Sequence, residues 1–213
     1  MQGDLLFIND NQILATQQVY AARIKDQIKK KTIITITGEV ESGKSEIAHL
    51  LGKKLSMDNI KTKVLNLDSF YKIPPKERHE WRKKQGLDKI GPEEYDWDNI
   101  KKMITAFQKN EKVTIPYADV IANEIDQLTT DFNGINVLII DGLYAVACTK
   151  ADLNIFIERS FEDSLQEQQK SMNENLDEWR HKELKKEHEV VNSLKHMADY
   201  FIDLDTSQNI YHI

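Results

Sequence analysis

The chain lacks most of the features that mark secreted, membrane-spanning or disulfide-stabilised proteins. Its single cysteine, Cys148, excludes an internal disulfide, and because it lies in the apolar segment 144–148 we interpret it as a small buried hydrophobic residue. No apolar run approaches the roughly 20 residues that a membrane-crossing helix needs, so we expect no membrane partner. The first residues, Met1 to Asp4, lack the basic start and long apolar core of a signal peptide. These absences predict a cytoplasmic protein.

The chain also has fewer basic than acidic residues. The chain has 29 lysines and arginines against 35 aspartates and glutamates, which gives a formal net charge of −6 at pH 7 and a pI near 5.6. A general nucleic-acid-binding protein would present a basic surface. We therefore expect no nucleic acid partner and a small molecule as the ligand. Whether the chain forms a homo-oligomer is left open.

Strand-like and helix-like segments alternate along the chain. Apolar runs typical of buried strands lie at 33–37, 64–67, 137–140, 155–157 and 200–202. Runs that are apolar throughout favour a parallel sheet whose two faces are both covered. We therefore predict an α/β fold with a doubly wound, five-stranded parallel sheet and helices on both faces.

Helical periodicity marks segments between these runs. Apolar residues recur at the spacing of an amphipathic helix in 100–107, and a second helix is expected within 161–197. The N-terminal extension, residues 1–31, is expected to contain a strand and a helix, at 5–8 and about 12–29. Because 40% of the 213 residues are hydrophobic, one compact domain spanning 1–213 can bury a sizeable core.

The most specific motif follows the first central run. Residues 33–37 lead directly into Gly38-Glu39-Val40-Glu41-Ser42-Gly43-Lys44-Ser45, which fits the pattern G-x-x-x-x-G-K-[ST]. A helix is expected next, because apolar residues in 47–55 fall at helical spacing. In this strand–loop–helix context the backbone N–H groups wrap a phosphate, and the helix N-terminus faces the same anion. We predict that Gly38 to Ser45 bind the phosphates of a nucleoside triphosphate.

Glu41 is unusual within this loop. It occupies a position where a small residue would let the backbone close on the phosphates, and it brings a carboxylate toward a polyanion. We expect its side chain to point to solvent and the affinity for nucleotide to be reduced. This leaves an alternative open, in which the protein binds nucleotide but is catalytically impaired or regulatory.

Two aspartates follow predicted strands. Asp141 closes the run 137–140, where a nucleotide-binding sheet delivers a carboxylate to a metal, and Ser45 would supply a hydroxyl ligand, which implies Mg²⁺. Asp68 follows the run 64–67. If that strand neighbours 33–37, the Asp68 carboxylate faces the γ-phosphate and can deprotonate an attacking hydroxyl. The alternative for each is an ordinary aspartate that caps a turn or helix.

Four further segments, together with the phosphate loop, give a recognisable pattern. They are Asp68-Ser69-Phe70-Tyr71, Tyr95-Asp96-Trp97-Asp98, Ile115-Pro116-Tyr117 and Ile140-Asp141-Gly142-Leu143-Tyr144. In this order the pattern resembles the uridine kinase and phosphoribulokinase family over roughly residues 33–203. The resemblance implies a P-loop kinase that transfers the γ-phosphoryl group of ATP to a hydroxyl of a small acceptor. It assigns Asp68 as the catalytic base, gives Lys44 the role of stabilising the transferred group, and places Tyr71 and Tyr117 near the acceptor.

The lid departs from the family pattern. Uridine kinases usually carry an Arg-rich lid after the fourth strand and a base-reading histidine beyond the proline-tyrosine segment, whereas 166–170 here reads Gln-Glu-Gln-Gln-Lys and 120–123 has no histidine. The acceptor is therefore left open. In the expected helical lid region, 161–198, cations would have to come from Lys170, Arg180, Lys182, Lys185 or Lys186. The alternative is a solvated charged face, on which His188 would also be solvated.

The segment 74–82 has a composition suited to a mobile loop at the acceptor site. Arg78 and Arg82 could hold a phosphate or carboxylate of the substrate. A surface connection held in place by Trp81 is the alternative. The sequence as a whole thus predicts an ATP- and Mg²⁺-dependent phosphotransferase with a small-molecule acceptor.

Overall fold

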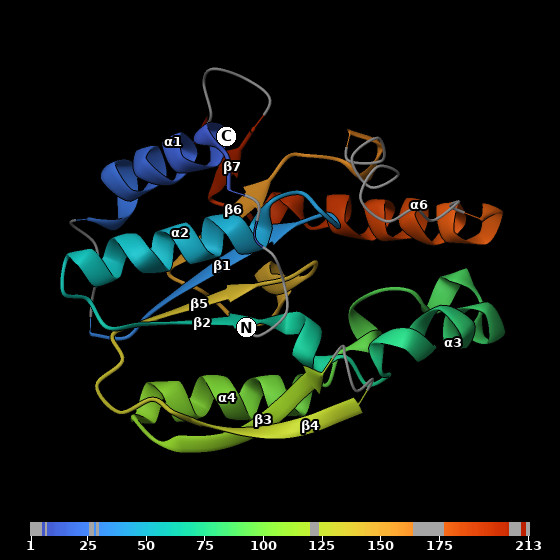
Figure 1. Ribbon diagram of the computed structural model, residues 1–213, viewed down its shortest axis with the longest axis horizontal. Helices are drawn as coiled ribbons and strands as arrows, with labels where there is room; N and C mark the ends of the chain where they lie inside the picture. Colours follow the sequence, from blue (N-terminus) through green and yellow to red (C-terminus); the bar gives the residue numbers. More distant parts are fainter. Residues whose placement is uncertain are drawn as a thin grey trace.

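A six-stranded sheet forms the centre of the computed structural model, which describes residues 6, 8–25, 28, 30–119, 124–163, 177–204 and 210–211 (Figure 1). The strands, in the order β2-β5-β1-β6-β7-β8, are β2 Thr62–Asn66, β5 Val137–Asp141, β1 Thr32–Gly38, β6 Leu153–Ile157, β7 Tyr200–Ile202 and β8 Ile210–Tyr211. The first five in this order pair in parallel, and β8 is antiparallel to β7. The predicted five-stranded parallel sheet is confirmed, with one short strand added at its edge.

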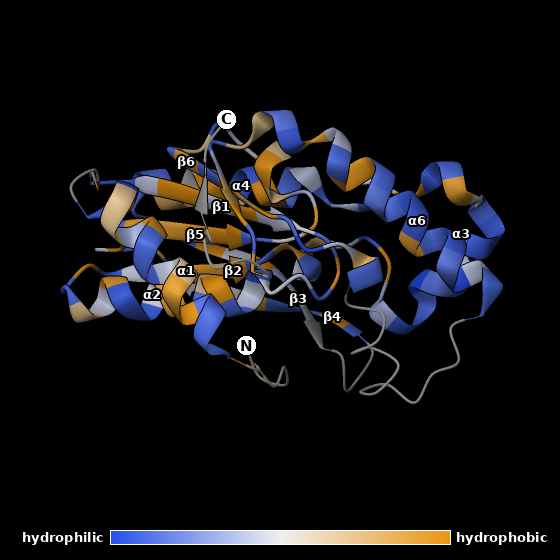
Figure 2. Ribbon diagram, turned by 90° about the horizontal axis from the view of Figure 1, so that it is seen from above, coloured by the Kyte–Doolittle hydropathy of each residue, from blue (hydrophilic) through white to orange (hydrophobic). Residues whose placement is uncertain are grey.

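Helices cover both faces of this sheet. The α-helices are α1 Asp10–Val19, α2 Lys44–Met57, α3 Arg78–Gln85, α4 Trp97–Lys109 and α6 Glu178–Ser193, of which α3 lies beyond the ends of the strands and covers neither face. In Figure 1, α1 and α2 lie on one face and α4 lies on the other. Successive side chains of a strand face opposite sides, so Ile34 packs in the cluster that contains α2, whereas Ile33 packs in the cluster that contains α4. This double coverage explains why β1 and β5 are buried along their whole length, and Figure 2 shows β5 as mainly hydrophobic.

The N-terminal helix begins earlier than its prediction. α1 starts at Asp10, because Asn9 and Gln12 form a capping box, and it continues as a π-helical turn over Tyr20–Ile24. Residues 26, 27 and 29 of the predicted helix, and residues 5 and 7 of the predicted strand, lie outside the described residues.

Two expectations from the sequence, a buried Cys148 and no membrane-crossing helix, can be compared with the structure. Burial raises the pKa of the Cys148 thiol to about 12, so the thiol stays protonated at neutral pH. The interpretation of this residue as a small buried hydrophobic group is confirmed. Within the described ranges, every helix is too short or too polar to cross a bilayer.

A separate two-stranded hairpin, which the sequence analysis does not predict, lies beside α4 (Figure 1). β3 Lys112–Asp119 pairs antiparallel with β4 Glu124–Asp131. Most of β4 is exposed, so its polar residues give no apolar run. Ile115 and Phe132 are buried, and the Phe132 ring packs edge-on against Phe107 of α4, with 5.7 Å between ring centroids. A small number of apolar side chains therefore anchors the hairpin to the core.

The segment 74–82 is partly helical, since α3 starts at Arg78, and the guanidinium of its last residue is already bound by two glutamates. Arg82 is 2% exposed, and its Nε and Nη2 donate to the two carboxylate oxygens of Glu94 at 2.7 and 2.8 Å. Its Nη1 donates to Glu187 of α6 at 2.6 Å. Although burial alone disfavours the charge, the hydrogen bonds to Glu94 and the charge of Glu187 raise the pKa of Arg82 above its ordinary value. This engagement argues against the predicted role of Arg82 as a substrate ligand.

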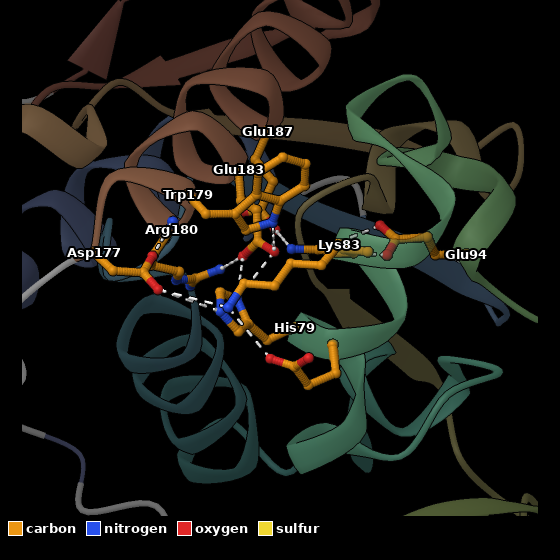
Figure 3. A network of polar contacts seen from close by, with 10 residues as sticks. His79, Lys83, Glu94, Asp177, Trp179, Arg180, Glu183 and Glu187 are labelled. Atoms are coloured by element: carbon orange, nitrogen blue, oxygen red, sulfur yellow. Dashed lines mark hydrogen bonds and ion pairs between the residues drawn. The ribbon is translucent and has the colours of Figure 1, made fainter.

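A second polar network joins α3 to α6 (Figure 3). The buried carboxylate of Glu183 accepts hydrogen bonds from Trp179 Nε1 at 3.0 Å and Arg180 Nη1 at 2.9 Å. It also lies 3.0 Å from Nδ1 of His79 on α3. Asp177, which caps the N-terminus of α6, lies 3.8 Å from Nε2 of the same imidazole. The two helices are thus connected by charged groups rather than by an apolar seam.

The solvated charged face, the alternative for the cations of this helix, describes only one side of α6. Glu183 and Glu187 are buried, whereas Lys182 is exposed and pairs with Glu178 at 2.6 Å. Lys170, one of the expected lid cations, lies outside the described residues.

Replacing Phe132 by alanine should lower the free energy of unfolding by about 3–5 kcal/mol, because it empties a buried aromatic site. Urea denaturation measures the change. Leu128 of β4 is a matched control, since it is 47% exposed on the same hairpin, and Leu128→Ala should change stability by about 0.5 kcal/mol or less. Equal effects of the two variants would contradict the assignment of Phe132 as the anchor.

Arg82→Ala should lower the free energy of unfolding by about 3–5 kcal/mol, because it leaves two buried carboxylates without a counter-charge. The neighbouring Lys83 is the control. Its pairs with Glu80 and Asp177 are exposed, so Lys83→Ala should leave the urea midpoint near the parental value. An Arg82→Ala variant of parental stability would restore the case for a substrate ligand at this position.

Candidate active site

The phosphate loop runs from the end of β1 to the start of α2, as predicted. Gly38 is the last residue of β1, and Gly43, with a φ of 94°, caps the N-terminus of α2. A Cβ atom at Gly38 would lie 2.6 Å from the Ser42 Oγ, so glycine is needed there. The loop residues therefore stand at the N-terminus of a 14-residue helix, where backbone N–H groups and the helix dipole favour an anion.

Lys44 and Glu41 are two of the charged residues of this loop. The Nζ of Lys44 donates to the Glu39 carbonyl at 2.5 Å. Burial lowers the pKa of Lys44, and the nearby carboxylates of Asp68 and Asp141 oppose that shift. Glu41 is exposed, as expected, and its φ of 56° is left-handed, a conformation that costs a non-glycine residue energy.

Ser45, Asp141 and Asn66 meet at the carboxyl ends of three adjacent strands and the start of α2. The Ser45 hydroxyl donates to Asp141 Oδ2 at 2.7 Å, and the Asn66 amide donates to the same oxygen at 2.9 Å. Strand register explains the meeting, because Asp141 of β5 pairs with Ile36 of β1 on one side and with Asn66 of β2 on the other. Burial raises the pKa of Asp141 to about 6, against the opposing effects of the Ser45 hydrogen bond and the Lys44 charge.

This pair of oxygen ligands fits Mg²⁺. Within the described residues no three histidine, cysteine, aspartate or glutamate side chains gather into a metal cage. Mg²⁺ at a phosphate site usually takes only one or two protein ligands, and substrate phosphates and water supply the rest. The Ser45 hydroxyl and the Asp141 carboxylate, already 2.7 Å apart, match that requirement.

Asp68 follows β2 within a 3₁₀ turn, Leu67–Phe70. Its backbone N–H donates to the Asn66 side chain at 2.6 Å, which holds the turn at the strand end. The role predicted for Asp68 assumes that β2 is the neighbour of β1. The structure differs, because β5 lies between these two strands. Asp68 is nevertheless exposed on the same cavity as Lys44.

The cavity measures about 710 Å³ and lies between the phosphate loop, α3 and α6. Among the predicted site residues, those that line it are Val40, Glu41, Gly43, Lys44, Ser45, Asp68, Tyr71, Arg78, Arg82 and Arg180. Tyr117, on β3, is half-buried and is not part of the lining. Residues predicted to bind the nucleotide and residues predicted to bind the acceptor thus line the same cavity.

Arg78 and Tyr71 form the acceptor side of this space. The Arg78 guanidinium carbon lies 3.3 Å from the centroid of the Tyr71 ring, a cation–π contact. Burial raises the pKa of the Tyr71 hydroxyl above its ordinary value, and the Asp68 charge adds to the shift. Among the contacts of the described residues, Arg78 has no carboxylate partner, so its charge is available to an anion. Arg180 also lines the cavity, but Glu183 already binds it.

Sequence reasoning missed several polar residues of the site. Asn66 could have been found from its place at the end of a parallel strand, the position that also identified Asp141. Glu187 gave no such signal, because its burial depends on contact with α3. His188, expected to be solvated, lies 2.8 Å from the carboxylate of Glu39 in the phosphate loop.

The curated relatives are uridine kinases. The enzyme of Schizosaccharomyces pombe is 30% identical over 135 residues, which cover 61% of this chain and 29% of that protein. The enzyme of Ureaplasma parvum is 26% identical over 141 residues, which cover 64% of this chain and 67% of that protein. The match thus spans less than a third of the first relative's length.

A solved structure shares the fold of this chain, and a family model shows its family. Phosphoribulokinase from Rhodobacter spheroides superposes with a TM-score of 0.63 at 11% identity, over 82% of this chain and 70% of that one, which shows a shared fold. The model of the Phosphoribulokinase / Uridine kinase family matches residues 33–203, most of the chain. The chain therefore belongs to the Phosphoribulokinase / Uridine kinase family of P-loop small-molecule kinases.

Proposed function

We propose that the protein transfers the γ-phosphoryl group of ATP to a hydroxyl of a small acceptor, as a uridine kinase does. The observation that carries this proposal is the shared cavity. Lys44 and Ser45 of the phosphate loop face the same space as the exposed carboxylate of Asp68. A phosphoryl donor, a base and a bound hydroxyl could therefore come together without movement of the sheet.

The roles follow from charge and position. The loop N–H groups and Lys44 would hold the β- and γ-phosphates and stabilise the charge that develops on the transferred group. Ser45 and Asp141 would hold Mg²⁺, which when bound neutralises phosphate charge. Asp68 would orient the acceptor hydroxyl and take its proton as the oxygen attacks phosphorus.

On the acceptor side, Tyr71 and Arg78 are the proposed ligands, with Arg180 above them on α6. Arg78 is suited to a phosphate or carboxylate on the acceptor, because a guanidinium binds such groups through paired hydrogen bonds. Tyr117 keeps its proposed acceptor role only if β3 approaches the cavity, since it is not part of the lining. Screening nucleosides, pentose phosphates and hydroxy acids for ADP release would identify the acceptor.

A second candidate function is nucleotide binding without turnover. The left-handed Glu41, which carries a carboxylate on the cavity wall, supports it. ATP binding without ADP release on any acceptor of the screen would favour this second function and overturn the first.

Asp68→Asn should lower acceptor phosphorylation by about 10²–10⁴-fold, because the amide keeps the size of the side chain but cannot accept the hydroxyl proton. Coupled measurement of ADP release gives the rate, and calorimetry should show nearly unchanged ATP binding. Asp141→Asn is the comparison, since loss of a metal contact should raise the Mg²⁺ concentration needed for activity. Parental turnover by Asp68→Asn would refute the proposed mechanism.

Lys44→Ala should abolish most of the thermal stabilisation by Mg·ATP, because it removes the cation of the loop that faces the cavity. A ligand at 100 times its Kd stabilises a protein by about 2.7 kcal/mol, which is a shift of several degrees. Lys53→Ala, on the exposed side of the same helix, should keep the parental shift. If Lys44→Ala also keeps it, the nucleotide binds elsewhere.

A further inference from the structure

Glu39 places a second carboxylate in the phosphate loop, and this one is buried. The residue is 5% exposed, and both of its oxygens are engaged. Oε2 accepts a hydrogen bond from the Phe161 backbone N–H at 2.7 Å, and Oε1 lies 2.8 Å from His188 Nδ1. The carboxylate is therefore held by groups outside the loop, one just beyond β6 and one on α6.

The same residue also holds the catalytic lysine. The backbone carbonyl of Glu39 accepts the hydrogen bond from Lys44 Nζ. A change in the position of Glu39 would thus move the acceptor of the lysine as well as the carboxylate. His188 is the side-chain partner on which that position depends, whereas the Phe161 donor is a backbone N–H that every substitution except proline leaves in place.

A carboxylate in this loop is an electrostatic problem for a polyphosphate site. Like charges repel, and the repulsion is strong where burial lowers the dielectric constant. Two N–H donors on the Glu39 oxygens reduce this repulsion, since a charge-assisted hydrogen bond disperses the negative charge and fixes its direction.

We propose that His188 is a positioning residue for nucleotide binding, which holds the Glu39 carboxylate away from the phosphates and compensates its charge. The inference rests on the proposed function only in that the loop binds ATP. Glu187 of α6 already binds Arg82 of α3. The proposal adds a second role for the same helix, which is to hold the phosphate loop through His188. One helix would then support both the loop and the acceptor wall.

His181 offers a matched control. Both imidazoles pack edge-on against the Phe161 ring, His181 with 5.8 Å and His188 with 5.7 Å between centroids. Within the described residues, however, His188 alone of the two bonds to the phosphate loop. A variant at His181 removes a similar aromatic contact of α6 without touching Glu39.

The test is the Kd of Mg·ATP, measured by calorimetry on the full chain. His188→Ala should raise Kd about tenfold, the effect of losing one charge-assisted hydrogen bond. His181→Ala should stay within about twofold of the parent, and His188→Gln, whose amide can still donate, should recover most of the affinity. Melting curves without nucleotide check that each variant is folded.

A double variant separates charge compensation from simple support of α6. Glu39→Gln removes the charge, so adding it to His188→Ala should return Kd to within about threefold of the Glu39→Gln value. Parental affinity in His188→Ala, or a double variant as weak as His188→Ala alone, would overturn the inference. A parent that binds no ATP would overturn it together with the proposed function, whereas ATP binding without phosphorylation of any acceptor would overturn the proposed function alone.

Discussion

Parallel pairing of β5 with both β1 and β2 is the constraint on which the site depends. It sets Ile36, Asp141 and Asn66 side by side, so that three strands end at one edge of the sheet. The phosphate loop, the Asp141 carboxylate and the turn that carries Asp68 leave from that edge, where ligands bind in open α/β sheets. Because both faces of β1 and β5 are buried, a shift of register by one residue would move every packed side chain to the opposite face, and the polar groups at the strand ends are held by the same packing.

The other wall of the cavity has a different origin. α3 and α6 are mainly hydrophilic, as Figure 2 shows, and they meet through Arg82 and Glu183 rather than through apolar contacts. Burying such charges costs desolvation energy, which an apolar contact would avoid. Directional hydrogen bonds nevertheless determine which faces of the two helices meet. We regard this as the reason why Arg78, one turn before Arg82, is left facing the cavity.

Local patterns in the sequence were sufficient for one half of the site. The β1–loop–α2 unit is continuous in the chain, and Asp68 and Asp141 each follow an apolar run, so position along a strand predicts position at the edge. Contacts between distant segments could not be predicted in this way. Arg78 and Arg82 have the same composition and spacing signals, and only the partners of Arg82, which lie 12 and 105 residues away, distinguish them. The Glu39–His188 contact, across 149 residues, escaped for the same reason, whereas the β3–β4 hairpin escaped because the exposed, polar residues of β4 give no apolar run.

The buried group of Arg82, Glu94 and Glu187 has a consequence for how such a chain can diverge. Each of the three positions lies in a different segment, yet loss of Arg82 leaves two buried carboxylates without a counter-charge, and loss of either glutamate leaves part of the buried guanidinium without a hydrogen-bond acceptor. Replacement of a whole buried ionic group by apolar residues is often tolerated, whereas loss of one member is not. These three positions should therefore change together or not at all, and descendants of this chain should retain the group intact or carry an apolar set in its place.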